Sequence, residues 1–369
     1  MAVYKIFPSA DATLYSKYPA QNTGLDEILE VAAKNNLNPA NSLVESVPSE
    51  PILYDDIRRS VIKFSNEDLD KIKLFVTSSW KVGLKLYLAN ADNLSTTYSL
   101  EVRQVSQSWD MGTGQFGDSP ETRNGVCWYS TSSYSTPTSS WATNASQYFM
   151  TPGGGSFTGS YYGTQSFDYK ASKDPNIDVT SIVNSWFSGS ANNGFLVKLP
   201  TNIESSSNSY LGLSFFSVDT HTIYPPTLEM KWDDSIFTGS LATVTYSNFV
   251  VTIANNQGSY LSKTGLVKFR ISARDKYPAR AFTTSSIYTV NKRLPQTSYW
   301  ALQDMKTTDM VIDFDDQYTK VSSDSNGSYF NLYMNGLEPE RYYKLLIKTD
   351  LITGESINID NDCIFKITR

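Results

Sequence analysis

The stretch Arg59 to Phe64 reads RSVIKF, and apolar and polar residues alternate along it. Two later stretches repeat the pattern: GLKLYL from Gly83 to Leu88 and LEVRQV from Leu100 to Val105. Alternation with a period of two residues is typical of β-strands that have one buried and one exposed face. These stretches predict a β-sheet protein.

The composition favours the same class. Aromatic residues make up 13% of the chain and include 24 tyrosines, set among many Ser, Thr, Asn and Gly residues. Tyrosine suits a half-buried pleated surface, and Ser, Asn and Gly suit turns. With 369 residues, the chain is long enough for about two or three domains. A polar segment, DDSIFTGS after Trp232, predicts a boundary that separates domains 1–234 and 235–369.

Short strands fill the expected C-terminal domain, and this favours a β-sandwich. The expected strands are Phe249–Ala254, Leu266–Ala273, Met310–Phe314, Tyr329–Met334, Tyr342–Thr349 and Cys363–Ile367. Two short helices are expected in the N-terminal domain. One covers Asn66–Lys71 after an N-cap at Ser65, and the other covers Val179–Phe187 between caps at Asp178 and Gly189.

Charge and residue usage exclude several functions. The chain has 31 basic and 37 acidic residues, a net charge of −6, so we expect no nucleic-acid partner. One histidine, His221, and two cysteines, Cys127 and Cys363, disfavour zinc, haem and iron–sulfur sites. We expect no cofactor, no metal, and free buried thiols. MAVYKIFP at the start is no secretory signal, and no window is apolar enough for a membrane helix. The protein is expected to fold in a cytoplasm, with no membrane partner.

Three motifs have a structural interpretation that outweighs the chemical one. GTGQFG, from Gly112 to Gly117, matches the letters of a dinucleotide fingerprint, but Pro120 and Gly125 follow it and no βαβ unit is expected. The pair Asp55-Asp56 and two similar pairs, Asp233-Asp234 and Asp315-Asp316, consist of adjacent carboxylates, which point apart on a strand or loop. Carboxylates at 313–316 and 360–362 lack the spacing of a calcium loop. No catalytic residue is predicted.

Aromatic residues are the candidates for binding. Trp109, Trp128, Tyr129 and Trp141 could form either a stacking surface for a glycan or a protein interface, and core packing is the plainer alternative. The segment Ser130 to Ser166 is rich in Ser, Thr, Gly and aromatic residues and nearly uncharged. We expect it to be an ordered loop or ribbon that contacts a partner.

The first part of the chain resembles the DNRLRE-type β-sandwich domain of bacterial surface proteins and carbohydrate-active enzymes. The resemblance lies in DATLYSKYPAQNTGLDEILEV (11–31), RRSVIKF (58–64), VRQVSQSWDMGTGQ (102–115), IDVTSIVNSWFSGSANNGFLVKL (177–199) and PPTLEMKW (225–232). It implies a jelly-roll-like β-sandwich. Sugar binding by some relatives is not carried over to named residues, because the segments 130–166 and 32–55 depart from the family pattern.

The segment NGLEPERYYKLLIKT, from Asn335 to Thr349, is similar to the Leu-x-Pro-x-x-x-Tyr turn of fibronectin type III and immunoglobulin-like domains. This resemblance implies an immunoglobulin-like β-sandwich at the C-terminus. It also implies that Tyr342 or Tyr343 is a corner tyrosine whose hydroxyl hydrogen bonds back to the turn.

The opening 31 residues also resemble virion structural proteins of marine tailed phages with contractile tails. The resemblance implies a non-enzymatic structural component of a phage particle, assembled in the host cytoplasm and placed at the neck or tail. Its partners would be other virion proteins, with many copies around a symmetry axis. The alternative is a carbohydrate-binding or host-attachment module.

Overall fold

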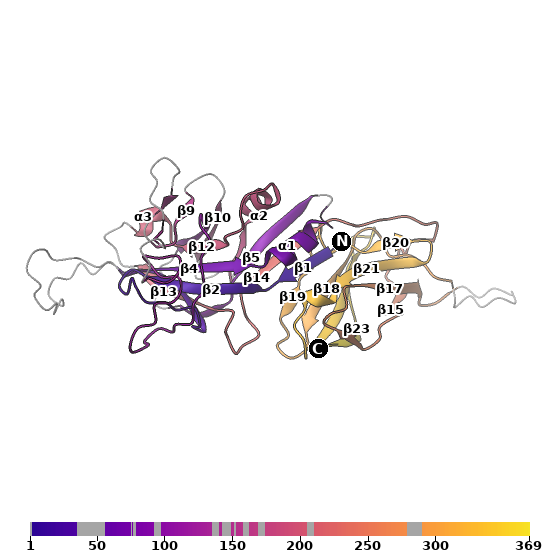
Figure 1. The fold of residues 1–369 in the computed structure, drawn as a ribbon. Helices are drawn as coiled ribbons and strands as arrows, with labels where there is room; N and C mark the ends of the chain where they lie inside the picture. The colour runs from indigo at the N-terminus through magenta and orange to yellow at the C-terminus, as the bar shows by residue number, and fades with distance from the viewer. Residues whose placement is uncertain are drawn as a thin grey trace, which may run out of the picture. The chain divides into compact units, whose positions relative to one another are not determined.

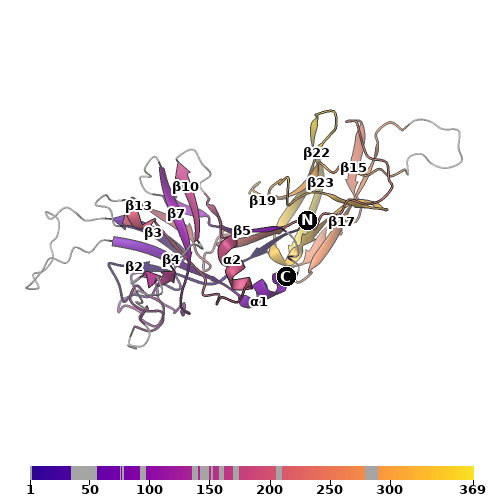
Figure 2. The ribbon, with the colours of Figure 1, turned by 90° about the horizontal axis from the view of Figure 1, so that it is seen from above.

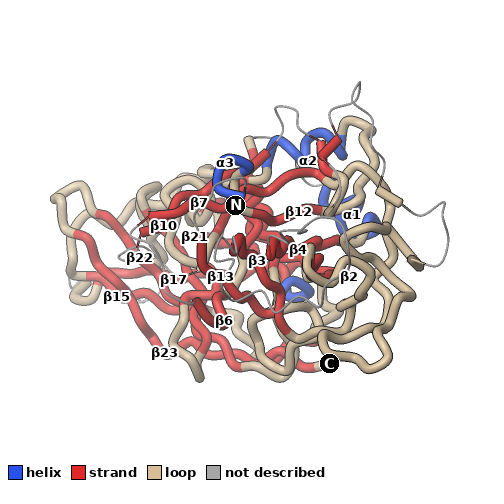
Figure 3. The backbone as a smooth tube through the Cα atoms, turned by 90° about the vertical axis from the view of Figure 1, so that its left-hand side faces the viewer, coloured by secondary structure: helices blue, strands red, loops and turns tan. Residues whose placement is uncertain are grey.

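The computed structural model describes residues 2–34, 56–74, 76, 79–91, 97–134, 140–141, 149–150, 153–157, 162–168, 174–204, 210–278 and 290–369. Strands dominate these residues, and the helices among them are short (Figure 3). The predicted all-β sandwich class is confirmed. No helix among the described residues is long and apolar enough to cross a membrane.

The chain folds into two compact units. The N-terminal unit comprises Ile6–Phe75 and Lys81–Glu229, and the C-terminal unit comprises Met1–Lys5, Val76–Trp80 and Met230–Arg369. The last change of unit therefore falls at Met230, just before the polar segment that follows Trp232. The two short early segments have no counterpart in the sequence prediction. The first of these segments, Met1–Lys5, belongs to the C-terminal unit because Val3 is buried in the core of that unit.

A large sheet forms the body of the N-terminal unit. Its strands run in the order β10-β7-β12-β4-β3-β13-β6, β2 also pairs with β4, and the pairings described are antiparallel (Figure 3). Figure 1 labels strands β2, β4, β10, β12 and β13 of this sheet. The strand bounds are β2 Pro8–Tyr15, β3 Ile28–Lys34, β4 Asp56–Phe64, β6 Leu88–Ala91, β7 Thr97–Gln104, β10 Tyr162–Asp168, β12 Phe195–Lys198 and β13 Tyr210–Phe216.

Both faces of this sheet are covered, so its central strands are more completely buried than the alternating pattern suggested. Val61 of β4 and Leu196 of β12 point into one hydrophobic cluster, formed with buried tryptophans. Phe195, the residue before Leu196 in β12, faces the opposite side of the sheet. There its ring centroid lies 4.8 Å from that of Trp186 and 5.9 Å from that of Phe64. Successive residues of a strand point to opposite faces, which accounts for this division.

The expected helices are present with small corrections. Helix α1 covers Asn66–Lys73, and the hydroxyl of Ser65 accepts a hydrogen bond from the backbone N–H of Glu67. Helix α2 covers Thr180–Phe187 and begins one residue later than expected. The N-cap is therefore Val179 rather than Asp178, although the Asp178 carboxylate still accepts from the N–H of Thr180. Figure 2 shows α1 and α2 near each other, and Lys73 Nζ at the end of α1 donates to the backbone carbonyl of Phe187 at the end of α2. Helix α3 covers Thr201–Glu204.

Smaller elements complete the N-terminal unit. Strand β5 (Trp80–Lys85), which belongs to this unit from Lys81 on, pairs with β11 (Asn176–Asp178), and β8 (Phe149–Met150) pairs with β9 (Ser156–Phe157). The predicted ribbon between Ser130 and Ser166 thus contains the β8-β9 pair, most of β10 and an isolated antiparallel bridge between Ser130 and Ser140, and its other described residues are loop. The segment 32–55, which departs from the family pattern, falls outside the described residues from residue 35 on, and residues 32–34 belong to β3.

The C-terminal unit contains two sheets, in the orders β15-β17-β21-β20 and β16-β23-β22-β18-β19. Their strands are β15 Phe249–Ile253, β16 Ser259–Leu261, β17 Leu266–Asp275, β18 Ser298–Asp304, β19 Met310–Ile312, β20 Ser322–Asp324, β21 Gly327–Tyr333, β22 Tyr342–Asp350 and β23 Ser356–Thr368. A 3₁₀ turn covers Met334–Gly336, β1 covers Ala2–Ile6, and β14 covers Thr227–Trp232. All six predicted strands are present, and β16, β18 and β20 were not predicted.

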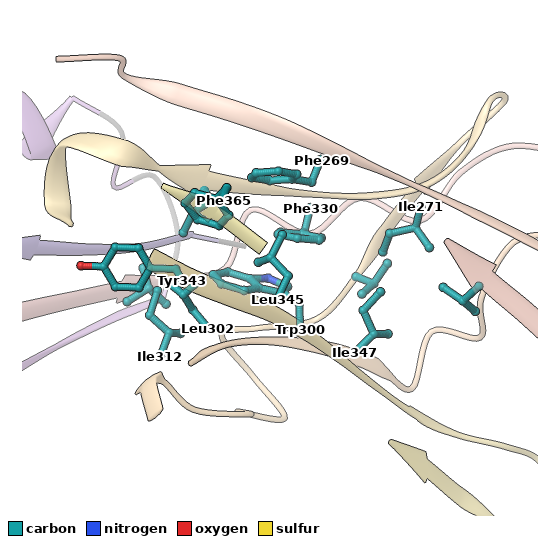
Figure 4. Close-up of a cluster of buried hydrophobic side chains, with 14 of the residues drawn as sticks. Phe269, Ile271, Trp300, Leu302, Ile312, Phe330, Tyr343, Leu345, Ile347 and Phe365 are labelled. Carbon is teal, nitrogen blue, oxygen red and sulfur yellow. The ribbon is translucent and has the colours of Figure 1, made fainter. Parts of the chain in front are cut away.

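Aromatic rings fill the space between the two sheets of the C-terminal unit (Figure 4). Phe330 of β21 is stacked between Phe269, at 5.3 Å, and Trp300, at 4.9 Å. Phe365 of β23 lies 5.8 Å from Phe269. Stacked rings from facing sheets are the packing expected of a β-sandwich core.

Candidate functional site

Three of the four aromatic residues singled out from the sequence are buried. Trp109, Trp128 and Trp141 are only 4–7% exposed and belong to one hydrophobic cluster of the N-terminal unit. A ring stacks on a sugar only if its face is open to solvent. The tryptophans therefore form core in this structure and not a stacking surface, whereas Tyr129 is 42% exposed.

Each of these three buried indoles has a polar or charged partner. Trp109 Nε1 donates to the backbone carbonyl of Asn193 at 2.8 Å, and Trp141 Nε1 donates to that of Cys127 at 3.0 Å. The guanidinium of Arg59 lies over the ring of Trp128, 4.9 Å from its centroid. Buried Trp N–H groups need such acceptors, so the cluster pins the loops that contain Asn193 and Cys127.

The exposed aromatic rings of this region lie instead on the loops next to the tryptophan cluster. Tyr129 and Tyr134 are stacked with 6.0 Å between ring centroids, and Tyr18 meets Phe116 edge to face at 5.6 Å. The backbone N–H of Tyr129 donates to the carbonyl of Pro19, so the two pairs lie on adjacent loops. We call Tyr18, Phe116, Tyr129 and Tyr134 the aromatic loop surface. Their exposed fractions lie between 37% and 51%.

Asn22 joins the loops beneath this surface and is completely buried. Its Nδ2 donates to the carbonyls of Met111, at 2.7 Å, and Val126, at 2.8 Å. Its Oδ1 accepts from the N–H groups of Gly114, at 2.8 Å, and Gly24, at 3.3 Å. One side chain therefore satisfies backbone groups of three separate loop segments, which makes the surface above it rigid.

The glycines of GTGQFG serve this packing. Gly112 has φ +78°, a conformation that favours glycine, and a Cβ there would lie 2.3 Å from Asn22 Oδ1. A Cβ at Gly114 would lie 2.4 Å from the carbonyl oxygen of Asn22. The motif is thus a structural loop, as the sequence context indicated, and Gly112 and Gly114 allow the close approach of Asn22, whereas a Cβ at Gly117 would meet nothing within 4 Å.

A buried ionic cluster lies beside Trp128 and was not found from the sequence. Glu204 accepts from Arg59 Nε at 3.0 Å, from Arg59 Nη2 at 2.8 Å and from Lys198 Nζ at 3.0 Å. Arg59 Nη1 also donates to the carbonyl of Gly153 at 2.7 Å. We call Arg59, Lys198 and Glu204 the buried ion triad. The sequence did contain a sign of this cluster. Arg59 lies two residues before the buried Val61 in a strand, so its side chain points to the same face of the sheet, into the core.

The triad is suited to holding structure rather than to meeting a ligand. Lys198 is 0% exposed, and its burial lowers the pKa of its ammonium group, while the charge of Glu204 opposes that shift. The bidentate contact with Arg59 and the contact with Lys198 occupy both carboxylate oxygens of Glu204. The cluster ties β4, β12 and α3 to the loop at Gly153.

Tyr343 is the residue that makes the hydrogen bond of a corner tyrosine. Its hydroxyl donates to the backbone carbonyl of Glu338 at 3.2 Å, and its ring is buried in the core of the C-terminal unit. Tyr342 points the other way and is 55% exposed, with Lys366 Nζ 5.7 Å from its ring centroid. Alternation along β22 decides between the two tyrosines.

The carboxyl group of Glu338, next to this corner, makes the stability of the folded protein depend on pH. Burial, and to a smaller extent the charge of Asp304, raise the pKa of Glu338, Arg341 and Lys5 oppose the shift, and the resulting pKa is about 7. The folded state then holds a proton that the unfolded state releases, so stability is full below the ordinary pKa of Glu338 and declines as pH rises through about 7. We expect Glu338→Gln to remove this decline and to stabilise the protein at pH 8 by about 1 to 2 kcal/mol, allowing for solvent screening.

Urea unfolding between pH 4 and 8 measures this effect. Glu340→Gln is the matched control, because Lys366 lowers the pKa of the exposed Glu340 and its titration lies at more acid pH. The prediction is contradicted if the free energy of unfolding of Glu338→Gln falls with pH above pH 5 as steeply as that of the unaltered protein.

The described residues contain no group of three or more His, Cys, Asp or Glu side chains that could hold a metal ion. Cys127 is buried and Cys363 is half-buried, and both are free thiols. His221 is exposed, and its Nε2 lies 3.3 Å from Glu27 Oε1.

Comparisons with known proteins add little to this site. No protein-family model and no curated protein matches the chain. Among solved structures, the chain is aligned with a β-glucuronidase of Parabacteroides merdae at 10% identity and a TM-score of 0.16. The alignment covers 96% of this chain and 35% of the glucuronidase chain. A similarity at this level identifies neither a family nor an activity for the chain.

Proposed function

We propose that this chain is a non-enzymatic structural protein that acts through protein–protein contacts made by the aromatic loop surface. The observation that carries the proposal is the combination of exposed rings with a rigid support. Tyr129 and Tyr134 lie open to solvent on loops that the buried Asn22 holds in place. Tyrosine and phenylalanine are enriched at protein interfaces, and a rigid surface loses little entropy when it binds.

The proposed setting is the virion of a tailed bacteriophage, at the neck or tail. The resemblance of residues 1–31 to virion structural proteins supports this setting, and the all-β architecture is compatible with it. In a ring of copies, each aromatic loop surface would meet a neighbouring virion protein. Weak individual contacts are strengthened when many copies bind together.

Quantitative mass spectrometry of purified phage particles tests this proposal. We expect the chain in the particles at a copy number that is a multiple of a ring symmetry. We further expect Tyr134→Ser to reduce its incorporation at least threefold, because the variant removes a ring from the contact. Tyr246→Ser is the matched control, since Tyr246 is 70% exposed but lies in the C-terminal unit. Absence of the chain from purified particles contradicts the proposal.

A second candidate function is glycan binding. Tyr129 and Tyr134 present stacked rings, and the guanidinium of Arg123 lies 5.8 Å from the ring centroid of Tyr134. An exposed ring beside a charged hydrogen-bond donor suits a sugar face and its hydroxyl groups. A glycan array separates the candidates: binding that is lost in Tyr134→Ser and kept in Tyr246→Ser favours the glycan module, and no binding favours the structural role.

A further inference from the structure

One face of the C-terminal unit carries a row of basic side chains. Strand β17 directs Phe269 and Ile271 into the core of this unit. Successive residues of a strand point to opposite faces, so the even-numbered side chains of β17 lie on the outer face of the sheet. Three of them are basic: Lys268, Arg270 and Arg274. We call these three residues the basic row, which extends over about 20 Å at about 3.3 Å per residue.

Tyr329 of the neighbouring strand β21 holds two of these cations against the sheet. It is the register partner of Arg270. Lys268 Nζ lies 4.1 Å from the centroid of the Tyr329 ring, and the guanidinium of Arg270 lies 5.0 Å from it. Contacts between a cation and a ring are worth about 0.5 to 1 kcal/mol at exposed sites. They restrain the two side chains before a partner arrives, which lowers the entropy cost of binding.

Only one member of the basic row is neutralised by a carboxylate. Arg270 Nη1 donates to both carboxylate oxygens of Asp324, at 2.7 and 2.6 Å. Arg274 Nη1 donates to the backbone carbonyl of Asp275 at 3.2 Å, and Lys268 is exposed. In the part of the chain that the structure describes, neither Lys268 nor Arg274 pairs with a carboxylate. Their charges favour a partner surface that carries carboxylates.

The N-terminal unit of the same chain has such a surface. Asp26 Oδ1 accepts from the backbone N–H of Phe116 at 2.8 Å, and Asp118 Oδ2 accepts from that of Gln115 at 3.0 Å. We call Asp26 and Asp118 the acidic edge of the aromatic loop surface. The ring of Phe116 beside it is 51% exposed. A cation is attracted both by carboxylates and by the face of an aromatic ring.

Two cations lie near the same rings but leave the acidic edge without an ion pair. Arg123 pairs with Glu121 at 3.1 Å, and Lys17 Nζ lies 5.7 Å from the ring centroid of Tyr18. Neither of them forms an ion pair with the acidic edge within the described residues. The carboxylates of the edge therefore remain open to cations of another molecule.

We propose that the basic row of one copy of this chain binds the acidic edge and the adjoining Phe116 ring of a second copy. The two surfaces lie on different units, so each copy uses one surface toward each of two neighbours. Such head-to-tail contacts generate a ring where the rotation between neighbours closes, and a filament where it does not. The inference rests on the proposed function, because it makes a second copy the partner of the aromatic loop surface.

Sedimentation velocity of the purified full chain tests the inference. At about 50 mM NaCl we expect oligomers whose share grows with protein concentration. At about 500 mM NaCl the apparent dissociation constant should rise about tenfold, because salt screens exposed charge pairs. Lys268→Glu should weaken association about tenfold at the lower salt concentration, since it places a negative charge against the acidic edge.

Lys306→Glu is the matched control, because it makes the same change of charge at an exposed position between β18 and β19, in the other sheet of the unit. It should associate as the unaltered chain does. Equal weakening by Lys268→Glu and Lys306→Glu would show an effect of net charge alone and would overturn the inference.

A mixture of two weakened variants identifies the second surface. Asp118→Asn removes a charge from the acidic edge and keeps an oxygen that can accept from the N–H of Gln115. Asp118→Asn and Lys268→Glu should each associate weakly alone. Mixed in equal amounts, they should form dimers, because the first variant retains the basic row and the second retains the acidic edge.

The inference is overturned if the unaltered chain stays monomeric at low salt, or if the mixed variants associate no better than each variant alone. Association that is insensitive to salt and to Lys268→Glu would also overturn it, and would show that the rings bind without the basic row. These outcomes are separate from a failure of the proposed function, which is absence of the chain from purified particles.

Discussion

Replacement of Glu204 by glutamine is expected to lower the free energy of unfolding of the N-terminal unit by about 3 to 5 kcal/mol. The substitution preserves the shape of the side chain but removes the only negative member of the buried ion triad. Arg59 and Lys198 would then remain buried next to each other without the carboxylate that pairs with both, and only the more distant charge of Glu101 would oppose their repulsion. Removal of one partner from a buried ionic contact costs far more than the intact contact contributes, because it leaves an unpaired charge in a poorly solvated place.

Urea unfolding followed by tryptophan fluorescence measures this effect, since Trp109, Trp128 and Trp141 all lie in the N-terminal unit. Glu121→Gln is the matched control. Its partner Arg123 is 3.1 Å away, but both side chains are exposed, so we expect a change of less than about 1 kcal/mol.

A second substitution separates charge from packing. Lys198→Met introduced into Glu204→Gln removes one of the two stranded positive charges and retains an apolar chain of similar length. We expect it to restore part of the lost stability. A cost below about 1 kcal/mol for Glu204→Gln alone would show that the triad is not held as a desolvated unit.

The replacement of Asn22 by aspartate is expected to cost about 3 to 5 kcal/mol and to loosen the aromatic loop surface. Aspartate has nearly the same shape, but it has no Nδ2 to donate to the carbonyls of Met111 and Val126. A charged oxygen would face those two carbonyls in a fully buried place. Each buried carbonyl that loses its donor costs about 1 to 3 kcal/mol, and the repulsion adds to this loss.

Hydrogen exchange measures the loosening locally, because the N–H groups of Gly114 and Tyr129 should exchange faster when their loops open. Asn124→Asp is the matched control. Asn124 also donates within this loop, to Thr113 Oγ1 at 2.7 Å, but it is exposed, so water replaces the lost partner. Equal effects of the two substitutions would contradict the role given to Asn22.

Local pattern determined much of the secondary structure. RSVIKF is part of β4, and LEVRQV is part of β7 except for its last residue, Val105, because alternation reports directly on which residues point into a sheet. The strand predicted over GLKLYL is only partly confirmed, since β5 ends at Lys85 and β6 begins at Leu88. Short strands such as β16 and β20 escaped prediction because three residues are too few to show a period.

The candidate site was less accessible to sequence reasoning. Aromatic content drew attention to the segment near Trp128 and Tyr129, but a sequence does not state which rings are covered. The tertiary structure buries the tryptophans because backbone carbonyls at Asn193 and Cys127 lie within reach of two indole N–H groups. It leaves Tyr129 and Tyr134 outside, on the loops that these contacts hold.

The sequence by itself determined the all-β class, the two helices near α1 and α2, and the polar segment close to the last change of unit. These features depend on neighbouring residues, whose spacing and turn preferences are visible in a single stretch of chain. The tertiary structure alone decided which distant residues meet: Val3 with the C-terminal core, Arg59 with Glu204, and Asp11 with the loop at Asp219. Such contacts depend on the path of the whole chain, because burial and electrostatic pairing act between residues that local periodicity does not connect.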